Sequence, residues 1–146
     1  MASPARVLVV AHRTAATPAL IEAVRARAQE SPATFTLLVP RALHGFHRLV
    51  DPEDGGEDET KAVLDLALPL LEEAAGGHVI GLVGDPDPIN AVQDAVHVHG
   101  FDEIIISTLS PRVSRWLHMD VPRRLQVLGL PITTVTAKGA KTAQPA

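Results

Sequence analysis

The sequence predicts an α/β domain built on a single open sheet of five parallel strands, with helices on both faces. Five short apolar runs rich in β-branched residues are spaced along the 146 residues, and amphipathic helical patterns lie between them. Strands that alternate with helices in this way form right-handed βαβ units, which build a parallel sheet. We therefore expect one α/β domain over residues 1–137 and a small, polar, disordered tail over residues 138–146.

The strands are recognised by their apolar character. Their predicted bounds are residues 7–11, 34–39, 78–83, 103–107 and 131–136. The runs around Val9, Leu37 and Ile105 are almost continuously apolar, which is typical of parallel strands covered on both faces. Only 3% of the residues are aromatic, so the core must be packed mainly from Val, Leu, Ile and Ala.

Two helices have clear start signals. Thr17-Pro18 and Asp87-Pro88 each place a capping side chain before a proline in the first helical turn. Gly100 stands where the glycine that ends the second of these helices belongs.

Two further helices carry prolines. One is expected over residues 60–75 with a kink at Pro69, because proline removes a backbone hydrogen bond inside a helix. A last short helix should begin at Asp120 and Pro122 and end at Gly129.

Composition excludes several classes of function. The net charge of −4 gives no general attraction to nucleic acid or to anionic membranes, and the chain has no Tyr and one Trp for stacking on bases. There is no Cys, so disulfides, thiolate catalysis and Cys-based zinc sites are absent. Since we find no secretory signal pattern and no apolar run near the length of a membrane span, we expect a soluble, cytoplasmic protein without nucleic-acid or membrane partners.

Three features carry a family resemblance. They are the alternating order of strands and helices, the turn Gly84-Asp85-Pro86 after the third strand, and the closing segment Gly129-Leu130-Pro131-Ile132-Thr133-Thr134-Val135. Together they resemble the universal stress protein family over residues 6–136. In that family the first strand usually ends in an Asp that helps to hold adenine nucleotide. Its ATP-binding members also carry G-x2-G after the fourth strand and, further on, Gly-Ser or Gly-Thr at a helix start.

This chain departs from those nucleotide motifs. His12 stands at the Asp position, Ser107 and Ser110 replace the first two glycines, and the final pair falls near Met119-Asp120. Glycines let backbone N–H groups approach a phosphate closely, and a side chain obstructs that approach. The Asp120 carboxylate should also cap the helix N-terminus that would receive the anion. We therefore expect ATP binding to be weakened or lost, with ATP and AMP as the possible nucleotide cofactors.

The candidate ligand site lies at the carboxyl ends of the strands, where open parallel sheets bind their ligands. The candidate residues, for a nucleotide or another small anion, are Ala11, His12, Arg13, Val39, Gly84, Asp85, Ser107, Thr108, Ser110, Arg112 and Asp120.

Four arginines gather after the fourth predicted strand, and two interpretations of them stay open. Arg112, Arg115, Arg123 and Arg124 could form an anion site, because guanidinium groups bind carboxylate and phosphate well. Alternatively, they are solvated or paired with the acidic stretch at residues 51–59, which we interpret as a solvated loop. We favour the second interpretation.

No metal site and no catalytic residue is predicted. His44 and His47 are spaced as a pair on one helix face, but nothing identifies the third ligand that a catalytic metal usually needs. The acidic stretch does not fit an EF-hand, because Ala62 stands where the bidentate Glu belongs. His97 and His99 are explained by the favourable position of imidazolium at a helix C-terminus.

The leading hypothesis is a non-catalytic regulatory or ligand-binding domain similar to universal stress proteins, with weakened or lost ATP binding. One alternative is an ordinary ATP- or AMP-binding stress protein. Another is a small-molecule enzyme that uses His12 and the cluster from Arg112 to Arg124. A third is an interaction module that uses the acidic stretch as its contact surface.

Assembly is predicted from the last strand, residues 131–136. Many universal stress proteins form two-fold dimers through this strand, so the resemblance implies a homodimer. From Pro131 to Thr136 the segment is β-prone and uncharged, and at a sheet edge it would offer unpaired backbone groups to a second copy. Pro131 lacks one of the donors.

Overall fold

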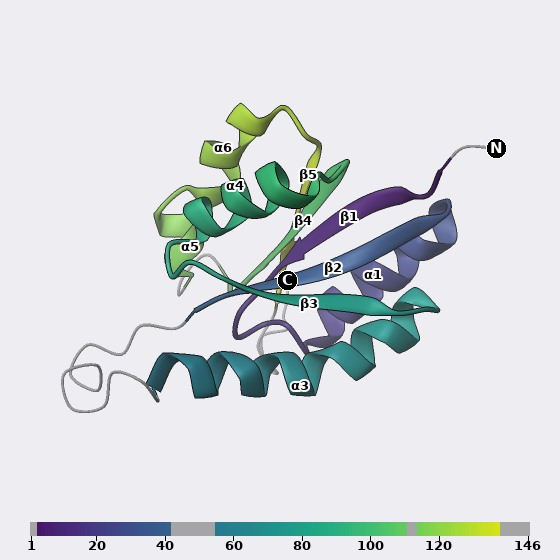
Figure 1. Ribbon diagram of the computed structural model, residues 1–146, viewed down its shortest axis with the longest axis horizontal. Helices are drawn as coiled ribbons and strands as arrows, with labels where there is room; N and C mark the ends of the chain where they lie inside the picture. The colour runs from purple at the N-terminus through teal and green to yellow at the C-terminus, as the bar shows by residue number, and fades with distance from the viewer. Residues whose placement is uncertain (1–2, 42–54, 111–113, 138–146) are drawn as a thin grey trace.

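The computed structural model describes residues 3–41, 55–110 and 114–137, the first four residues of the middle range by their backbone alone (Figure 1). In chain order the elements are β1 (Ala5–Val10), α1 (Pro18–Glu30), β2 (Ala33–Pro40), α3 (Gly55–Ala75), β3 (Val79–Gly84), α4 (Pro88–His99), β4 (Glu103–Thr108), α5 (Arg115–His118), α6 (Val121–Arg124), the 3-10 helix η1 (Leu125–Leu128) and β5 (Ile132–Thr136). The residues of the predicted tail, together with His44, His47 and Arg112, lie outside this description.

The five strands form one open sheet in the order β3-β2-β1-β4-β5, and every neighbouring pair is parallel. The predicted fold class is therefore confirmed, and each strand lies within two residues of its predicted bounds. The chain builds the sheet outward from β1 to β3 and then crosses back to add β4 and β5 on the other side of β1. Loops leave the sheet in opposite directions at β1 and β4, so this pair of strands is the topological switch point.

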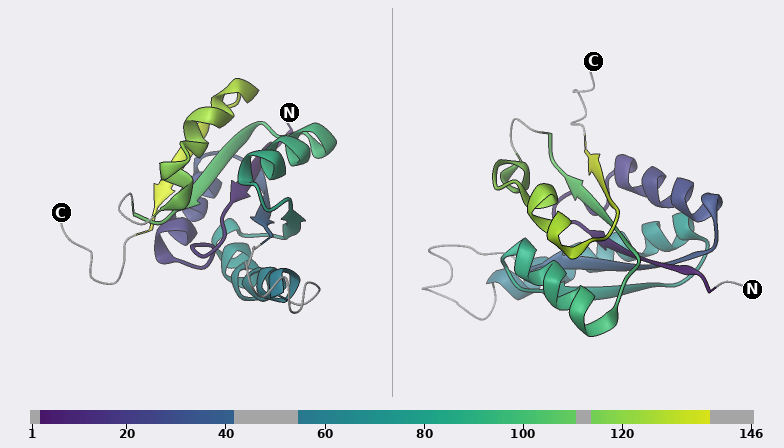
Figure 2. Two further views of the ribbon diagram at one scale, coloured as in Figure 1. Left: turned by 90° about the vertical axis from the view of Figure 1, so that its left-hand side faces the viewer. Right: turned by 90° about the horizontal axis from the view of Figure 1, so that it is seen from above.

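Helices cover both faces of the sheet (Figure 2). The alternation of side chains along β1 supplies one core on each side. Val7 and Val9 belong to the core with α1 and α3, whereas Leu8 and Val10 belong to the core with α4, α6 and η1. All four side chains have at most 1% of their surface exposed, which explains why β1 is apolar at every position from Val7 to Val10.

Two helix predictions need correction. α3 begins at Gly55, so residues 55–59 are helical rather than part of a loop. Pro69 lies inside α3 as predicted, and Figure 1 shows a continuous, curved helix; a kink at this residue stays a prediction.

The last predicted helix is also different. It divides into α6 and η1, and the four-residue turn of α5 before it was not predicted. Gly129 ends η1 with a φ of 73°, a left-handed conformation that suits glycine.

The cap predictions differ in outcome. Asp87 caps α4 as expected, because its Oδ1 accepts a hydrogen bond of 2.8 Å from the Ile89 N–H. Gly100 ends the same helix with a φ of 79°. Thr17 stands at the N-cap of α1 but makes no side-chain cap bond; its hydroxyl instead donates to the Thr14 carbonyl oxygen at 2.8 Å.

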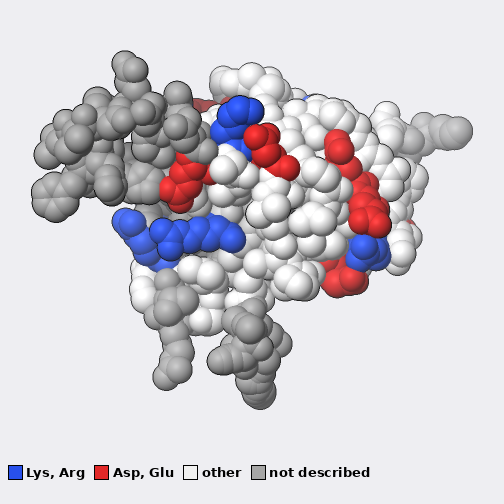
Figure 3. Space-filling view, turned by 90° about the horizontal axis from the view of Figure 1, so that it is seen from below, with Lys and Arg blue, Asp and Glu red and all other residues white. Residues whose placement is uncertain are grey.

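Figure 3 shows the face of the molecule on the side of α3, which is the lower side in Figure 1. Charged side chains on this face are interspersed with uncharged residues. Groups of both signs lie near one another on this face, and uncharged residues cover most of the described area. No helix of the described residues has the length and apolarity needed to cross a membrane.

Candidate functional site

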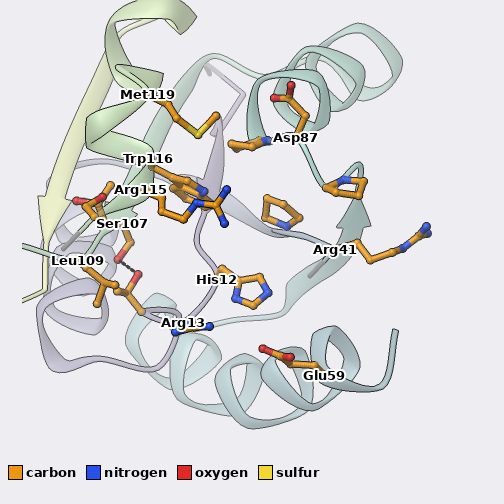
Figure 4. A pocket seen from close by; sticks show the side chains of 16 residues that line it. His12, Arg13, Arg41, Glu59, Asp87, Ser107, Leu109, Arg115, Trp116 and Met119 are labelled. Carbon is orange, nitrogen blue, oxygen red and sulfur yellow. Dashed lines mark hydrogen bonds between the residues drawn. The ribbon is translucent and has the colours of Figure 1, made fainter. Parts of the chain in front are cut away.

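A cavity of about 470 Å³ opens at the carboxyl end of the sheet. Its lining comes from the residues that end or follow β1, β2 and β4 and from the starts of α3, α4 and α5, so it lies at the switch point between β1 and β4 (Figure 4). Its volume falls in the range of about 300–1,000 Å³ that is usual for small-molecule sites.

The lining combines apolar, charged and hydroxyl side chains. The apolar ones are Pro40, Pro86, Pro88, Leu109, Trp116 and Met119. The charged ones are Arg13, Arg41, Glu59, Asp87 and Arg115. Hydroxyl groups come from Thr14, Ser107, Thr108 and Ser114, and His12 completes the lining. His12, Arg115 and Met119 extend toward the middle of the cavity in Figure 4.

The loop after β1 is tied to the end of β4 by two buried hydroxyl groups. Thr14 Oγ1 and Ser107 Oγ lie 2.6 Å apart, and both residues are at most 3% exposed. Two turn bonds hold the loop in place, from Thr17 N to Thr14 O and from Ala15 N to His12 O, each at 3.2 Å. This arrangement fixes the backbone from which His12 and Arg13 reach the cavity.

The N-terminus of α4 is already occupied. The Asp87 carboxylate caps it, and Asp85 Oδ1 accepts a hydrogen bond of 2.8 Å from the Asp87 N–H in the preceding turn. Two carboxylates at this helix start disfavour a bound anion there, although helix N-termini in general attract anions.

The short helix α5 supplies one wall. Ser114 Oγ accepts a hydrogen bond of 3.0 Å from the Leu117 N–H and so caps the turn. From this turn Arg115, Trp116 and Met119 reach the cavity.

Thr108, the last residue of β4, differs from the other hydroxyl-bearing residues of the lining. It is 2% exposed, and its Oγ1 has no hydrogen-bond partner among the residues that the structure describes. A buried polar group without a partner costs about 1–3 kcal/mol, so this hydroxyl is not explained by the hydrogen bonds of the described residues.

No protein-family model and no curated protein matches this sequence. Solved structures are similar to it. The structure of universal stress protein from Archaeoglobus fulgidus matches with a TM-score of 0.57 and 16% identity, over 88% of this chain and 93% of that one. The crystal structure of the hypothetical protein PH0823 matches with a TM-score of 0.56 and 14% identity, over 90% and 96%.

The chain has the universal stress protein fold. The resemblance predicted from the order of elements is thereby confirmed at the level of fold. It does not extend to ligands, because sequence identities this low carry no information about them.

Within the universal stress protein fold, the predicted site residues separate into two groups. Those that line the cavity are His12, Arg13, Ser107 and Thr108. Those that do not are Ala11, Val39, Gly84, Asp85, Ser110 and Asp120. Ala11 and Val39 are fully buried in the core, and Asp85 is used in the turn before α4.

Gly84 has a packing role. A Cβ at this position would lie 2.8 Å from the Ala91 Cβ and 2.9 Å from the Leu38 Cδ1, which is closer than Cβ atoms approach other carbon atoms in proteins. The glycine therefore lets α4 approach the end of β3.

The predicted cap by Asp120 is wrong. Asp120 has a φ of 60° and its side chain makes no bond to the start of α6. A capping side chain normally departs from extended backbone, and the left-handed conformation at Asp120 prevents this. The carboxylate instead lies 3.7 Å from Arg123, and both side chains are largely exposed. Of the described arginines in the predicted cluster, Arg115 lines the cavity, whereas Arg123 and Arg124 do not.

Sequence reasoning missed Arg41 and Trp116, and it noted Met119 only as part of the altered glycine pair. Arg41 follows β2 directly, so the rule that ligands bind at carboxyl ends of strands could have found it. Trp116 lies in α5 and Met119 directly follows it, and a turn of four residues is too short for an apolar period to reveal. Among the described residues, no group of three His, Asp or Glu side chains could hold a metal ion.

Proposed function

We propose that this domain binds a small anionic molecule at the carboxyl end of its sheet without transforming it, and that its affinity for ATP is weak or absent. The observation that carries the proposal is the switch-point cavity, which combines three arginines with the buried hydroxyl of Thr108, a group that has no partner in the described part of the chain. Such a concave site with few convergent polar groups is typical of small-molecule binding.

Weak ATP binding is supported by the side chains that replace the family's glycines. Ser107 is bonded to Thr14 in the buried floor, and Met119 extends into the cavity. The carboxylates of Glu59 and Asp87 in the same lining repel a polyphosphate.

A binding role rather than catalysis is supported by how the hydroxyl groups are used. Ser107 is bonded to another hydroxyl and Ser114 caps α5, so neither is arranged as a nucleophile beside a base. An enzyme that uses His12 and Arg115 is the second candidate, because both side chains extend toward the middle of one cavity. Turnover of a bound ligand would favour it.

Isothermal titration with ATP and AMP tests the proposal. We expect dissociation constants weaker than about 100 µM for both nucleotides, because the close backbone approach to phosphate is obstructed. Low-micromolar binding of ATP would show that the altered glycine positions do not matter and would restore an ordinary nucleotide-binding role.

We also infer that the chain forms a homodimer through β5. This strand lies at the edge of the sheet and is uncharged, and antiparallel pairing of two identical edges closes without propagating. Light scattering should give twice the 15.5 kDa mass of one chain at micromolar concentration. Val135→Pro should split the dimer, and so should Thr134→Lys, which changes an exposed residue. A monomeric mass for the unmodified chain would contradict the inference.

A further inference from the structure

The cavity has a charge balance that limits its ligand. Among the described lining residues, three arginines outnumber two carboxylates by one, leaving histidine aside. The several negative charges of a triphosphate would exceed this surplus, whereas a single carboxylate would match it. The start of α4 adds no further attraction for an anion, because the Asp87 carboxylate already caps it.

The apolar part of the lining is large for a site that holds only an inorganic anion. Trp116 and Met119 from the α5 turn share the cavity with Pro86 and Pro88 at the start of α4. Flat apolar rings pack well against an indole and against proline rings, and an aromatic body would remove this surface from water. Phosphate or acetate alone would leave this apolar surface exposed to water.

One hydroxyl can anchor the charged end. Thr14 and Ser107 satisfy each other, and Ser114 caps α5, but the buried Thr108 Oγ1 has no partner among the described residues. Arg115 extends into the same cavity and can pair with a carboxylate.

We propose that the ligand is a small aromatic monocarboxylate, its ring against Trp116 and Met119 and its carboxylate held by the Thr108 hydroxyl and Arg115. This inference rests on the proposed function and specifies the class of ligand. It predicts that both the ring and the single negative charge are required, and that the Thr108 hydroxyl, which has no partner among the described residues, serves binding rather than stability.

Naphthalene-2-carboxylate is the probe, measured by calorimetry and by the fluorescence of Trp116, the one tryptophan in the chain. We expect a dissociation constant below about 1 mM with quenching of the indole. Naphthalene-2-methanol, which keeps the ring without the charge, and acetate, which keeps the charge without the ring, should each bind at least about tenfold more weakly. Equal binding of the neutral alcohol, or no binding of the naphthoate, would overturn the inference.

Two variants test the anchor. Thr108→Val keeps the shape and should weaken naphthoate binding about tenfold, as should Arg115→Met. Arg124→Met is the matched control, because Arg124 is exposed and outside the cavity lining, and it should leave affinity unchanged. The melting temperature of Thr108→Val should stay the same or rise by up to about 5 °C, since an unsatisfied buried hydroxyl is removed. A fall in melting temperature with unchanged affinity would assign Thr108 a structural role and reject the anchor.

The outcomes separate this inference from the proposed function. If AMP or inorganic phosphate binds and changes Trp116 fluorescence while naphthoate does not, small-anion binding stands and the aromatic monocarboxylate is wrong. If ATP binds in the low micromolar range, the proposed function itself fails.

Discussion

Gly84→Ala is expected to destabilise the fold by about 1–3 kcal/mol, although it adds a single methyl group. The new Cβ would lie 2.8 Å from the Ala91 Cβ and 2.9 Å from the Leu38 Cδ1. The leucine terminus can rotate aside, but Ala91 is 2% exposed and fixed in α4, so the helix itself must move away from β3. Urea unfolding followed by circular dichroism measures the change.

Gly77→Ala is the matched control. Nothing lies within 4 Å of a Cβ built at Gly77, and its φ is not in the left-handed region. We expect a change of less than about 0.5 kcal/mol there. If both variants unfolded at the same urea concentration, close packing would not be the reason for a glycine at position 84, and a ligand role would return.

Thr14→Val should cost about 1–3 kcal/mol of stability, because it removes one of the two hydroxyls that join the loop after β1 to the end of β4. Ser107, at 1% exposure, would then keep a buried hydroxyl without its partner. Chemical denaturation of Thr14→Val, Ser107→Ala and the double variant measures the coupling between the two positions.

The double variant is the sharper part of this experiment. When both hydroxyls are gone, no buried polar group is orphaned at this contact, so the combined cost should fall below the sum of the single costs by about 1 kcal/mol. Additive costs would mean that the 2.6 Å contact contributes nothing specific to stability. The same loop carries His12 and Arg13, so ligand affinity should also fall in the single variants.

The sequence by itself determined the number of strands, their alternation with helices and the edge of the sheet at which the cavity opens. These features depend on local signals, namely apolar runs, caps such as Asp87 and the glycine at Gly100, which act within a few residues. The predicted bounds of every strand therefore lie within two residues of the observed ones. Local signals were weaker where turns are short, and α5 with Trp116 was missed for that reason.

Only the tertiary structure decided which of the candidate residues share a cavity. Thr14 and Ser107 are 93 residues apart, and their contact exists because β4 returns to lie beside β1. The same crossing brings Thr108 and Arg115 into the lining with His12, while it leaves Ala11 and Val39 inside the core. Asp120 is a case in which the residue type alone misleads. Aspartate is a common helix cap, but the left-handed backbone at Asp120 keeps its side chain from capping α6. The physical reason is that strand order and backbone conformation set where a side chain points. Short-range sequence patterns predict neither of them.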